Sequence, residues 1–284
     1  MKPLTLEELL QNINTLPPIP SLVIHVLELL DDKNSDTRLI SDQLACDPAL
    51  TASILAVCNS GYYSVRQEIT SIQMAISYLG RNTIKRILIT SLVSRYYQNL
   101  PKGYEAYPGQ LWEHCIAVAI FAELLGEHSA QLNRDTLFTV GLLHDVGKIV
   151  LNSLLHEEYQ KVLEITRQNS RPFEEVEREL FGFTHGEAGA YLLEKWKMPS
   201  VFIDVARHHC SPAPSHAPEV HVVAAANTMA RSMGLGTDIY IVECAPDHPL
   251  LDKISQQEGL MEDLIARFQQ SFQRTSELYR NAVK

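Results

Sequence analysis

The spacing of apolar side chains is the feature that most constrains this chain. Over most of its length these side chains recur at steps of three and four residues, which places them on one face of an α-helix. The pattern is clearest over residues 22–30, 50–58, 116–125 and 260–278. Strict two-residue alternation, which marks a half-buried strand, is rare. The sequence therefore predicts an all-α protein.

Two short segments depart from the helical pattern. Residues 65–72 are the best candidate for a strand or a loop, and residues 237–243 form a short run that favours β structure. Elsewhere, turn residues indicate where helices begin. Asp47 suits the N-cap of a helix and Pro48 suits its first turn.

Proline and glycine also mark a boundary between helical parts. They cluster over 99–108 without apolar periodicity, which is typical of a connection. We therefore expect a two-lobed protein in which an N-terminal helical lobe, 1–100, packs on a second helical lobe, 101–236. A helical C-terminal extension, 237–284, follows.

The C-terminal extension carries a clean amphipathic stripe. Leu260, Leu264, Phe268 and Phe272 lie four residues apart, so they share one face of a helix. This face must pack against another surface. Docking on the core of its own chain is the default expectation, and contact with a partner or a second copy, as in a homodimer, is the alternative.

Charge argues against nucleic acid as a partner. The chain of 284 residues is 45% hydrophobic, enough for a substantial core, and has a formal net charge of −10. An acidic protein repels phosphate backbones unless a basic patch overrides its field. The densest basic stretch holds Arg81, Lys85, Arg86 and Arg95 on a predicted helix, and we interpret it as a solvated face.

The five cysteines favour a cytoplasmic protein with reduced thiols. Their number is odd, their spacings are wide, and no Cys-x-x-Cys pair occurs. No run approaches the roughly 20 apolar residues of a membrane span. The first residues lack the apolar core of a signal peptide. We therefore expect no association with a membrane.

One motif, Gly-Leu-Leu-His-Asp-Val-Gly-Lys at 141–148, points to chemistry. His144 and Asp145 place an imidazole beside a carboxylate, the two side chains most used to hold a catalytic transition metal. Gly147 removes a side chain just past this pair. Lys148 puts a cation where a phosphate could bind.

Further histidines fall on predicted helices where a metal site could recruit them. His114 lies early in one helix, His185 begins another with Thr184 as its N-cap, and His208 and His209 end a third. Helical bundles commonly gather ligands in their core, and neutral imidazoles suit iron, zinc, manganese or nickel. We interpret the remaining histidines as surface or hydrogen-bonded residues.

These residues, in this order, resemble the HD superfamily of metal-dependent phosphohydrolases. The first half of the chain adds a narrower likeness to the HDOD domain, the HD-related output domain of bacterial signalling proteins. It rests on Leu-Pro-Pro-Ile-Pro at 16–20, Asp-Pro-Ala-Leu at 47–50, Cys-Asn-Ser-Gly-Tyr-Tyr at 58–63 and the phrase that ends in Leu-Gly at 79–80. The resemblance covers residues 10–236 and implies an HD-like helical core in the second lobe.

The resemblance implies a site for one or two divalent transition-metal ions. Asp145 would be a ligand that bridges the ions when two are bound, Lys148 would contact phosphate, and both would serve catalysis. The positions that match metal ligands are His114, His144, Asp145, His185, His208, His209 and Asn227. Because imidazole must be neutral to bind a metal, affinity should fall below about pH 6.

The chain also departs from the enzymes of this superfamily. Asn227 stands in place of a closing aspartate, and a neutral amide is a weaker ligand than a carboxylate. Gln110 stands where HD-GYP phosphodiesterases often carry a glutamate ligand, and residues 210–214 replace their Gly-Tyr-Pro phrase, so we do not expect hydrolysis of cyclic-di-GMP. Asp145 is then the only carboxylate expected near the metal, which favours one ion over a tight pair.

Three functions remain in view. The preferred one is a helical signalling module that acts through contacts with another signalling protein and binds a metal. The second is a metal-dependent phosphohydrolase acting on a nucleotide or another small phosphoester. The third is a scaffold whose histidines are relics. Fold resemblance alone does not supply an activity, so the choice depends on the site.

Overall fold

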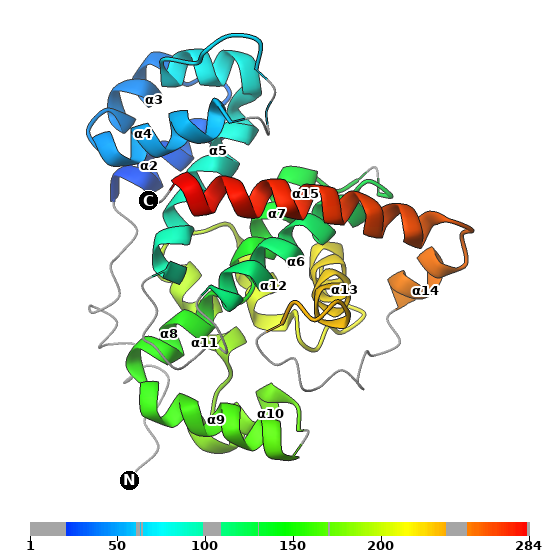
Figure 1. Cartoon of the computed structure of the whole chain (residues 1–284). Coiled ribbons are helices and arrows are strands. Elements are labelled where there is room, and N and C mark those ends of the chain that lie inside the picture. The colour runs from blue at the N-terminus through cyan, green and yellow to red at the C-terminus, as the bar shows by residue number, and fades with distance from the viewer. Residues whose placement is uncertain are drawn as a thin grey trace. The chain divides into compact units, whose positions relative to one another are not determined.

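A computed structural model of the chain describes residues 21–60, 63, 65–98, 109–129, 131–169, 171–236 and 249–282. Every regular element in these residues is an α-helix and none is a strand (Figure 1), which confirms the all-α prediction. Several sequence predictions fall outside this described part, namely those for 16–20, 61–62, 99–108, 237–243 and the side chain of Arg95.

The chain divides into two compact units, which we describe separately. The smaller unit holds the described residues of Pro17–Tyr96 and Ser271–Lys284, and the larger unit holds those of Tyr97–Gln270. The division falls near the end of a long helix, slightly before the predicted connection at 99–108. A second boundary falls within the last helix, between Gln270 and Ser271.

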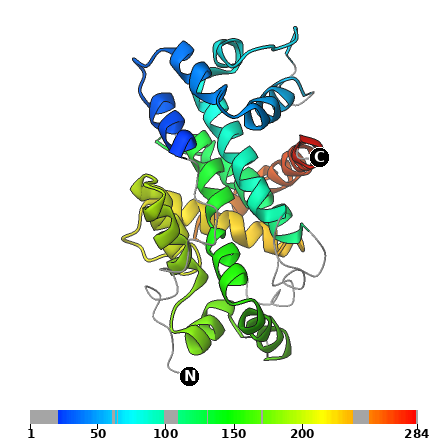
Figure 2. The same cartoon turned by 90° about the vertical axis from the view of Figure 1, so that its left-hand side faces the viewer.

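The smaller unit is built from the N-terminal helices. These are α2 (Ser21–Asp31), α3 (Thr37–Leu44), α4 (Pro48–Cys58) and the first part of α5 (Ile72–Gln98). Figures 1 and 2 show α2, α3 and α4 gathered beside α5. Asp47 caps α4 by accepting a hydrogen bond from the backbone N–H of Leu50, and Pro48 occupies the first turn, as predicted. Gly80 breaks α5 with φ 81° and ψ 162°, a backbone conformation open to glycine.

The basic stretch on α5 is not the solvated face that the sequence predicts. Arg81 donates a hydrogen bond of 2.9 Å to the carbonyl oxygen of Leu29, which lies near the end of α2. Lys85 lies 2.7 Å from the carboxylate of Asp31, and Arg86 is buried. The last carbonyl groups of a helix lack partners within it, so cations on a neighbouring helix satisfy them. Arg81 and Lys85 therefore join α5 to α2.

Residues 65–71 form a loop and not a strand. Asn59, just after α4, fixes this loop: its Oδ1 accepts a hydrogen bond of 2.7 Å from the N–H of Ile69. Its Nδ2 donates to the carbonyl oxygens of Ile69 and Leu55 at 2.8 and 2.9 Å. The side chain of Ile69 is fully buried, so this clamp anchors the loop to the core. The Asn of the Cys-Asn-Ser phrase thus has a structural role.

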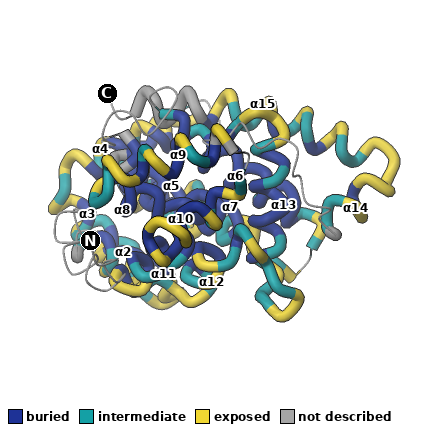
Figure 3. Tube along the Cα trace, turned by 90° about the horizontal axis from the view of Figure 1, so that it is seen from below, coloured by how far each residue is buried: buried dark blue, intermediate teal, exposed yellow. Residues whose placement is uncertain are grey.

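The larger unit surrounds one central helix. Its helices are α6 (Gln110–Gly126), α7 (Arg134–Leu143), α8 (Val146–Leu154), α9 (His156–Asn169), α10 (Phe173–Phe181), α11 (His185–Lys195), α12 (Ser200–His208), α13 (Pro218–Ser232), α14 (Pro249–Ser255) and the first part of α15 (Leu260–Ala282). Helix α6 is apolar nearly all round and packs mainly on α7 and α13, where buried residues concentrate (Figure 3).

One described stretch, Arg134–Leu154, is long and apolar enough to cross a membrane by composition alone. Its most apolar window is 89% buried inside the fold, and it consists of two helices, α7 and α8, with a break between them. These are the properties of core helices, whose neighbours in the fold cover the apolar surface.

The last helix docks on the core of the larger unit, which is the default expectation from the sequence. Leu264 and Phe268 are fully buried, and the ring of Phe268 stacks on that of Phe121 with centroids 3.9 Å apart. Arg267 adds an ion pair of 2.6 Å with Glu127 on the same side. At these positions the stripe is covered by its own chain.

Glycines allow the helices of the larger unit to approach closely. A Cβ added to Gly147 would lie 1.8 Å from the carbonyl oxygen of His185 and 2.6 Å from the backbone nitrogen of Gly189. The start of α8 therefore rests directly on the backbone of α11. This contact brings the segment after Asp145 against the residue that begins α11.

We predict that Asn59→Ala lowers the free energy of unfolding by about 2–3 kcal/mol, because three hydrogen bonds to the backbone, two of them part-buried, are lost at about 1 kcal/mol each. Urea unfolding followed by circular dichroism measures this change. The exposed Asn34→Ala should change stability by less than about 0.5 kcal/mol. Equal effects for both variants would contradict the clamp.

We predict that Gly147→Ala destabilises the protein by about 1–3 kcal/mol or more, because the new methyl group meets backbone atoms that cannot rotate away. Gly126→Ala is the matched control. Its Cβ meets only the flexible side chain of Leu137, and alanine also favours helix over glycine. Thermal unfolding of both variants makes the comparison, and a neutral Gly147→Ala would refute the close contact.

Candidate metal centre

Helix ends of the larger unit carry the side chains of the centre. His114 lies on the first turns of α6, His144 directly follows α7, and Asp145 is the residue before α8. His185 is the first residue of α11, and His209 directly follows α12. The break between α7 and α8 thus places the His-Asp pair of the sequence motif at a junction, where both side chains can turn inward.

A capping box fixes the start of α11. The Thr184 hydroxyl accepts a hydrogen bond of 3.3 Å from the N–H of Glu187, and the Glu187 carboxylate accepts one of 2.9 Å from the N–H of Thr184. This arrangement satisfies backbone donors that a helix start leaves unpaired. It confirms Thr184 as the predicted N-cap and positions His185.

Asp145 lies at the focus of two sets of donor atoms. Its Oδ2 is 3.4 Å from the Nε2 of His114 and 3.4 Å from the Nε2 of His144. Its Oδ1 is 3.3 Å from the Nε2 of His185 and 3.4 Å from the Nε2 of His209. All five side chains are at most 2% exposed. One buried carboxylate therefore faces four imidazoles.

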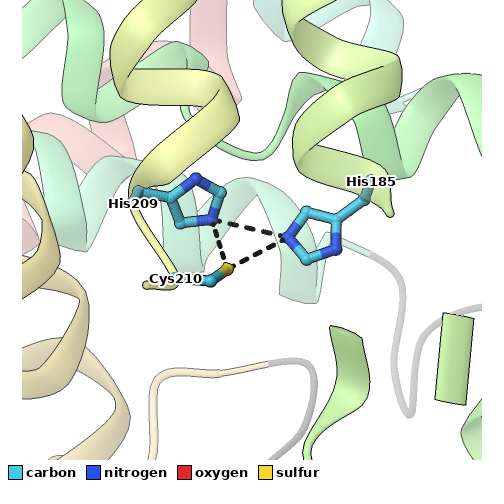
Figure 4. Close-up of side chains that lie close together, drawn as sticks. All are labelled: His185, His209 and Cys210. Atoms are coloured by element: carbon cyan, nitrogen blue, oxygen red, sulfur yellow. Dashed lines mark hydrogen bonds between the residues drawn. The ribbon is translucent and has the colours of Figure 1, made fainter. Parts of the chain in front are cut away.

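A thiol completes the second set. The Sγ of Cys210 lies 3.5 Å from the Nε2 of His185 and 3.1 Å from the Nε2 of His209. The two nitrogens are 3.4 Å apart. Figure 4 shows these side chains pointing toward one another from the start of α11 and the end of α12.

Hydrogen bonds at Nδ1 hold each ring in place. The Nδ1 of His114 lies 2.6 Å from the carbonyl oxygen of Leu235, and that of His144 lies 2.6 Å from the carbonyl oxygen of Gly141. The Nδ1 of His209 makes the same kind of contact with a carbonyl oxygen at the end of α12. A carbonyl oxygen only accepts, so Nδ1 must donate. In the neutral ring Nε2 then carries the lone pair, and it faces Asp145.

A carboxylate holds the fourth ring. The Oε2 of Glu177 accepts hydrogen bonds from the Nδ1 of His185 at 2.7 Å and from its backbone N–H at 2.9 Å. The hydroxyl of Tyr159 donates to the other carboxylate oxygen at 3.1 Å. Glu177 is fully buried on α10. Carboxylate–histidine pairs of this kind orient metal ligands and raise their basicity.

Lys148 supplies a positive charge to the centre. Its Nζ lies 2.8 Å from the Oδ2 of Asp145 and 5.3 Å from the centroid of the Phe173 ring. The side chain is 5% exposed, so it contacts solvent very little.

The charges around Asp145 keep it ionised. Burial alone would raise the pKa of this carboxyl, but the charges of His144 and Lys148 outweigh burial and hold the pKa well below its ordinary value. Burial in turn lowers the pKa of His144, and the attraction of Asp145 offsets only part of that effect. The Lys148 ammonium therefore supplies positive charge that does not depend on the protonation of His144.

The second set behaves differently. Burial opposes the charged form of His185, yet the interactions with Glu177 and Cys210 outweigh burial and raise the pKa of His185 well above 6.5. For His209, burial is again outweighed, chiefly by Cys210 and by the contact with Asp145, and its pKa rises as well. Both shifts favour the protonated rings, so protons compete with any other cation for them.

The structure does not bring His208 into the centre, contrary to the prediction. Its ring stacks on that of His216 with centroids 4.1 Å apart, and the side chain is only partly buried. Consecutive residues on a helix point roughly 100° apart, so only one of the pair, His209, can face inward. Partial burial, His216 and Arg207 lower the pKa of His208.

Gln110 and Asn227 are the two remaining positions that the sequence analysis compared with metal ligands of related enzymes. The Gln110 side chain donates a hydrogen bond of 2.7 Å to the carbonyl oxygen of Gly236, so it ties α6 to the segment that follows α13. Asn227 is buried on α13, and its Oδ1 accepts no hydrogen bond from the described residues. No measured contact joins Asn227 to Asp145, and it stays a predicted ligand.

The residues fit a metal ion. Nothing in the described part of the chain hydrogen-bonds to the Nε2 of His144 or to the Oδ1 of Asp145, although both atoms are buried. Leaving such groups unpaired costs about 1–3 kcal/mol each, and more for a charged group. Two groups of donors, His114–His144–Asp145 and His185–His209–Cys210, are each close enough to hold one ion. A cation satisfies all of these atoms together.

Sequence reasoning missed two residues of the centre. Cys210 directly follows His209, and this adjacency of a thiol to a proposed ligand was the available signal. Glu177 had no such signal, because it is one of several acidic residues on α10 and only the fold shows that it alone turns toward His185.

Similarity to known proteins agrees with this description. A family model described as HDOD domain matches residues 16–212. A curated protein of Treponema pallidum (strain Nichols), described as uncharacterized, is 26% identical over 227 residues, which are 77% of this chain and 43% of that protein. The chain thus spans less than half the length of this relative.

Solved structures share the fold. An HDOD domain protein of unknown function from Geobacter sulfurreducens is 25% identical with a TM-score of 0.76, and the match covers 99% of this chain and 97% of the other. A candidate phosphohydrolase from Shewanella amazonensis is 22% identical with a TM-score of 0.73, covering 95% and 97%. A candidate signal transduction protein from Marinobacter aquaeolei is 21% identical with a TM-score of 0.74, covering 97% and 61%. With most of its length matched by the family model, this chain belongs to the HDOD domain family.

Proposed function

We propose that the protein is a metal-binding signal-transduction module, in which a divalent transition-metal ion joins α6, the α7–α8 junction, α11 and α12 and so sets the state that a partner protein recognises. The observation that carries this proposal is the convergence of four anchored imidazoles on the buried carboxylate of Asp145. These side chains come from separate helices, so an ion bound to them restrains the helices as a group.

Burial favours regulation over turnover. The four histidines, Asp145 and Lys148 are each at most 5% exposed. A substrate must reach a hydrolytic metal, whereas an ion that holds helices together needs no such access. Binding to the folded state alone would stabilise it by about 2.7 kcal/mol at a hundred times the dissociation constant. This is enough to shift a conformational equilibrium of a few kcal/mol.

Lys148 favours a second function, a metal-dependent phosphohydrolase acting on a nucleotide or another small phosphoester. Its ammonium lies beside Asp145, where it could contact an oxygen of a phosphate. A metal in this centre would activate water and screen the charge of the phosphoester. The similarity to a candidate phosphohydrolase supports this alternative. The ordered arrangement of the rings argues against a scaffold with relic histidines.

We predict that wild-type protein, purified without a metal-binding tag, binds iron, manganese, nickel or zinc, and that Asp145→Asn abolishes this binding because the only carboxylate shared by both sets is lost. Elemental analysis and thermal unfolding with and without metal measure the effect. Asp204→Asn, at an exposed position of α12, is the matched control and should retain binding.

Assays with a panel of nucleotides and simple phosphoesters separate the two functions. A signalling module binds metal without metal-dependent turnover. Turnover that disappears in Lys148→Met while metal content is unchanged would instead establish the hydrolase. Wild-type protein that binds none of these metals would overturn both.

We predict that, as the pH is lowered, metal affinity already begins to fall at a pH above 6.5. Ligands with the ordinary imidazole pKa would begin to lose affinity only at a lower pH. The reason is that the pKa values of His185 and His209 are raised, so protons compete with the metal already near neutrality. For each proton that the metal must displace, metal affinity falls roughly tenfold when the pH is lowered by one unit. Calorimetric titration in buffers of different ionisation enthalpy counts the released protons, and constant affinity from about pH 8 to about pH 6 would contradict this prediction.

A further inference from the structure

Cys210 occupies the place of a ligand and has no role in the function proposed so far. It shares one corner of the centre with His185 and His209, and all three donor atoms face a common point (Figure 4). The fourth side of that point is the Oδ1 of Asp145, which is buried and accepts no hydrogen bond from the described residues. An unpartnered carboxylate oxygen in this position indicates a missing cation.

The distances that join the two rings to each other, to the carboxylate and to the thiol match a tetrahedral site. Zinc bonds of about 2.0–2.1 Å to nitrogen or oxygen and about 2.3 Å to sulfur place tetrahedral donors about 3.3 Å apart, or about 3.6 Å where one is sulfur. The Nε2 atoms of His185 and His209 are 3.4 Å apart, and they lie 3.3 and 3.4 Å from the Oδ1 of Asp145. The Sγ of Cys210 is 3.5 Å from His185 and 3.1 Å from His209.

The thiol also changes the charge of the centre. With Asp145 as the only anion, two divalent cations would be poorly neutralised. A thiolate at Cys210 adds a second negative ligand, and the buried carboxylate of Glu177 adds a third charge through His185. The argument against two ions, which counted a single carboxylate, therefore does not apply.

We propose that His185, His209, Cys210 and the Oδ1 of Asp145 form a closed tetrahedral site for a thiophilic divalent ion of the zinc type. This inference rests on the proposed metal binding and names a second, distinct ion within it. The neighbouring set holds three His and Asp donors among the described residues, namely His114, His144 and the Oδ2 of Asp145. Four protein donors without an open position are typical of structural ions, and three with an open position are typical of reactive ones.

The two sites would therefore hold different parts of the fold together. The thiolate site holds the start of α11 to the end of α12, where Gly186 already brings the helices together: a Cβ there would lie 2.8 Å from the carbonyl oxygen of Ala206. The three-donor site holds its ion between α6 and the α7–α8 junction. Asp145 couples them, because each of its oxygens belongs to one site.

Cobalt(II) is the probe for this proposal, because thiolate ligation gives it strong near-ultraviolet charge-transfer absorption. The full chain is stripped with a chelator, reloaded with cobalt and analysed for bound ions. We expect the thiolate absorption in wild type, and its loss together with one bound ion in Cys210→Ser. Cys46→Ser, at an exposed cysteine of the smaller unit, should keep both.

The outcomes separate this inference from the proposed function. Cobalt bound without thiolate absorption, or absorption that persists in Cys210→Ser, overturns the thiolate site and leaves metal binding intact. No bound ion in wild type overturns both.

A measurement on wild type guards against a variant that fails to fold. Zinc should slow alkylation of Cys210 by iodoacetamide by about tenfold or more, because a metal-bound thiolate is a poorer nucleophile and is shielded. Peptide mass spectrometry reads each cysteine separately, and Cys46 should react at the same rate with and without zinc. Equal alkylation of Cys210 in both conditions would refute the proposal.

Discussion

The structure of the larger unit depends on the contact between one buried carboxylate and four imidazoles. Asp145 is surrounded by rings from α6, α11, α12 and the residue beside it, and each of its oxygens faces two of them. Ionised groups at this depth are costly unless they are paired. In the absence of metal, the Lys148 ammonium supplies positive charge, and the raised pKa values of His185 and His209 favour protons on these rings. A metal ion would replace those protons.

The surrounding fold serves this contact. Gly147 lets α8 rest on the backbone of α11, so that Asp145 and His185 can meet. Carbonyl oxygens at helix ends hold the Nδ1 atoms, and Glu177 holds the ring that has no carbonyl beside it. The rings are thus oriented before any ion arrives. This preorganisation reduces the entropy lost on binding and favours the proposed metal site.

Much of this arrangement could be predicted from the sequence, and the failures have physical causes. Periodicity predicts the helices, and cap residues such as Asp47 and Thr184 predict where two of them begin. The family pattern predicts the convergence on Asp145. It does not tell which of two adjacent histidines faces inward, since that depends on where α12 ends. Cys210 was passed over because a lone thiol has no spacing signature, although its neighbour was a predicted ligand.

The measurement that tests the account most directly is a crystal structure of the zinc-loaded protein, with anomalous scattering recorded at the zinc edge. The account predicts anomalous density at bonding distance from Asp145, bounded by the Nε2 atoms of the surrounding rings. Rings that turn away from Asp145, with no anomalous density between them, would contradict it.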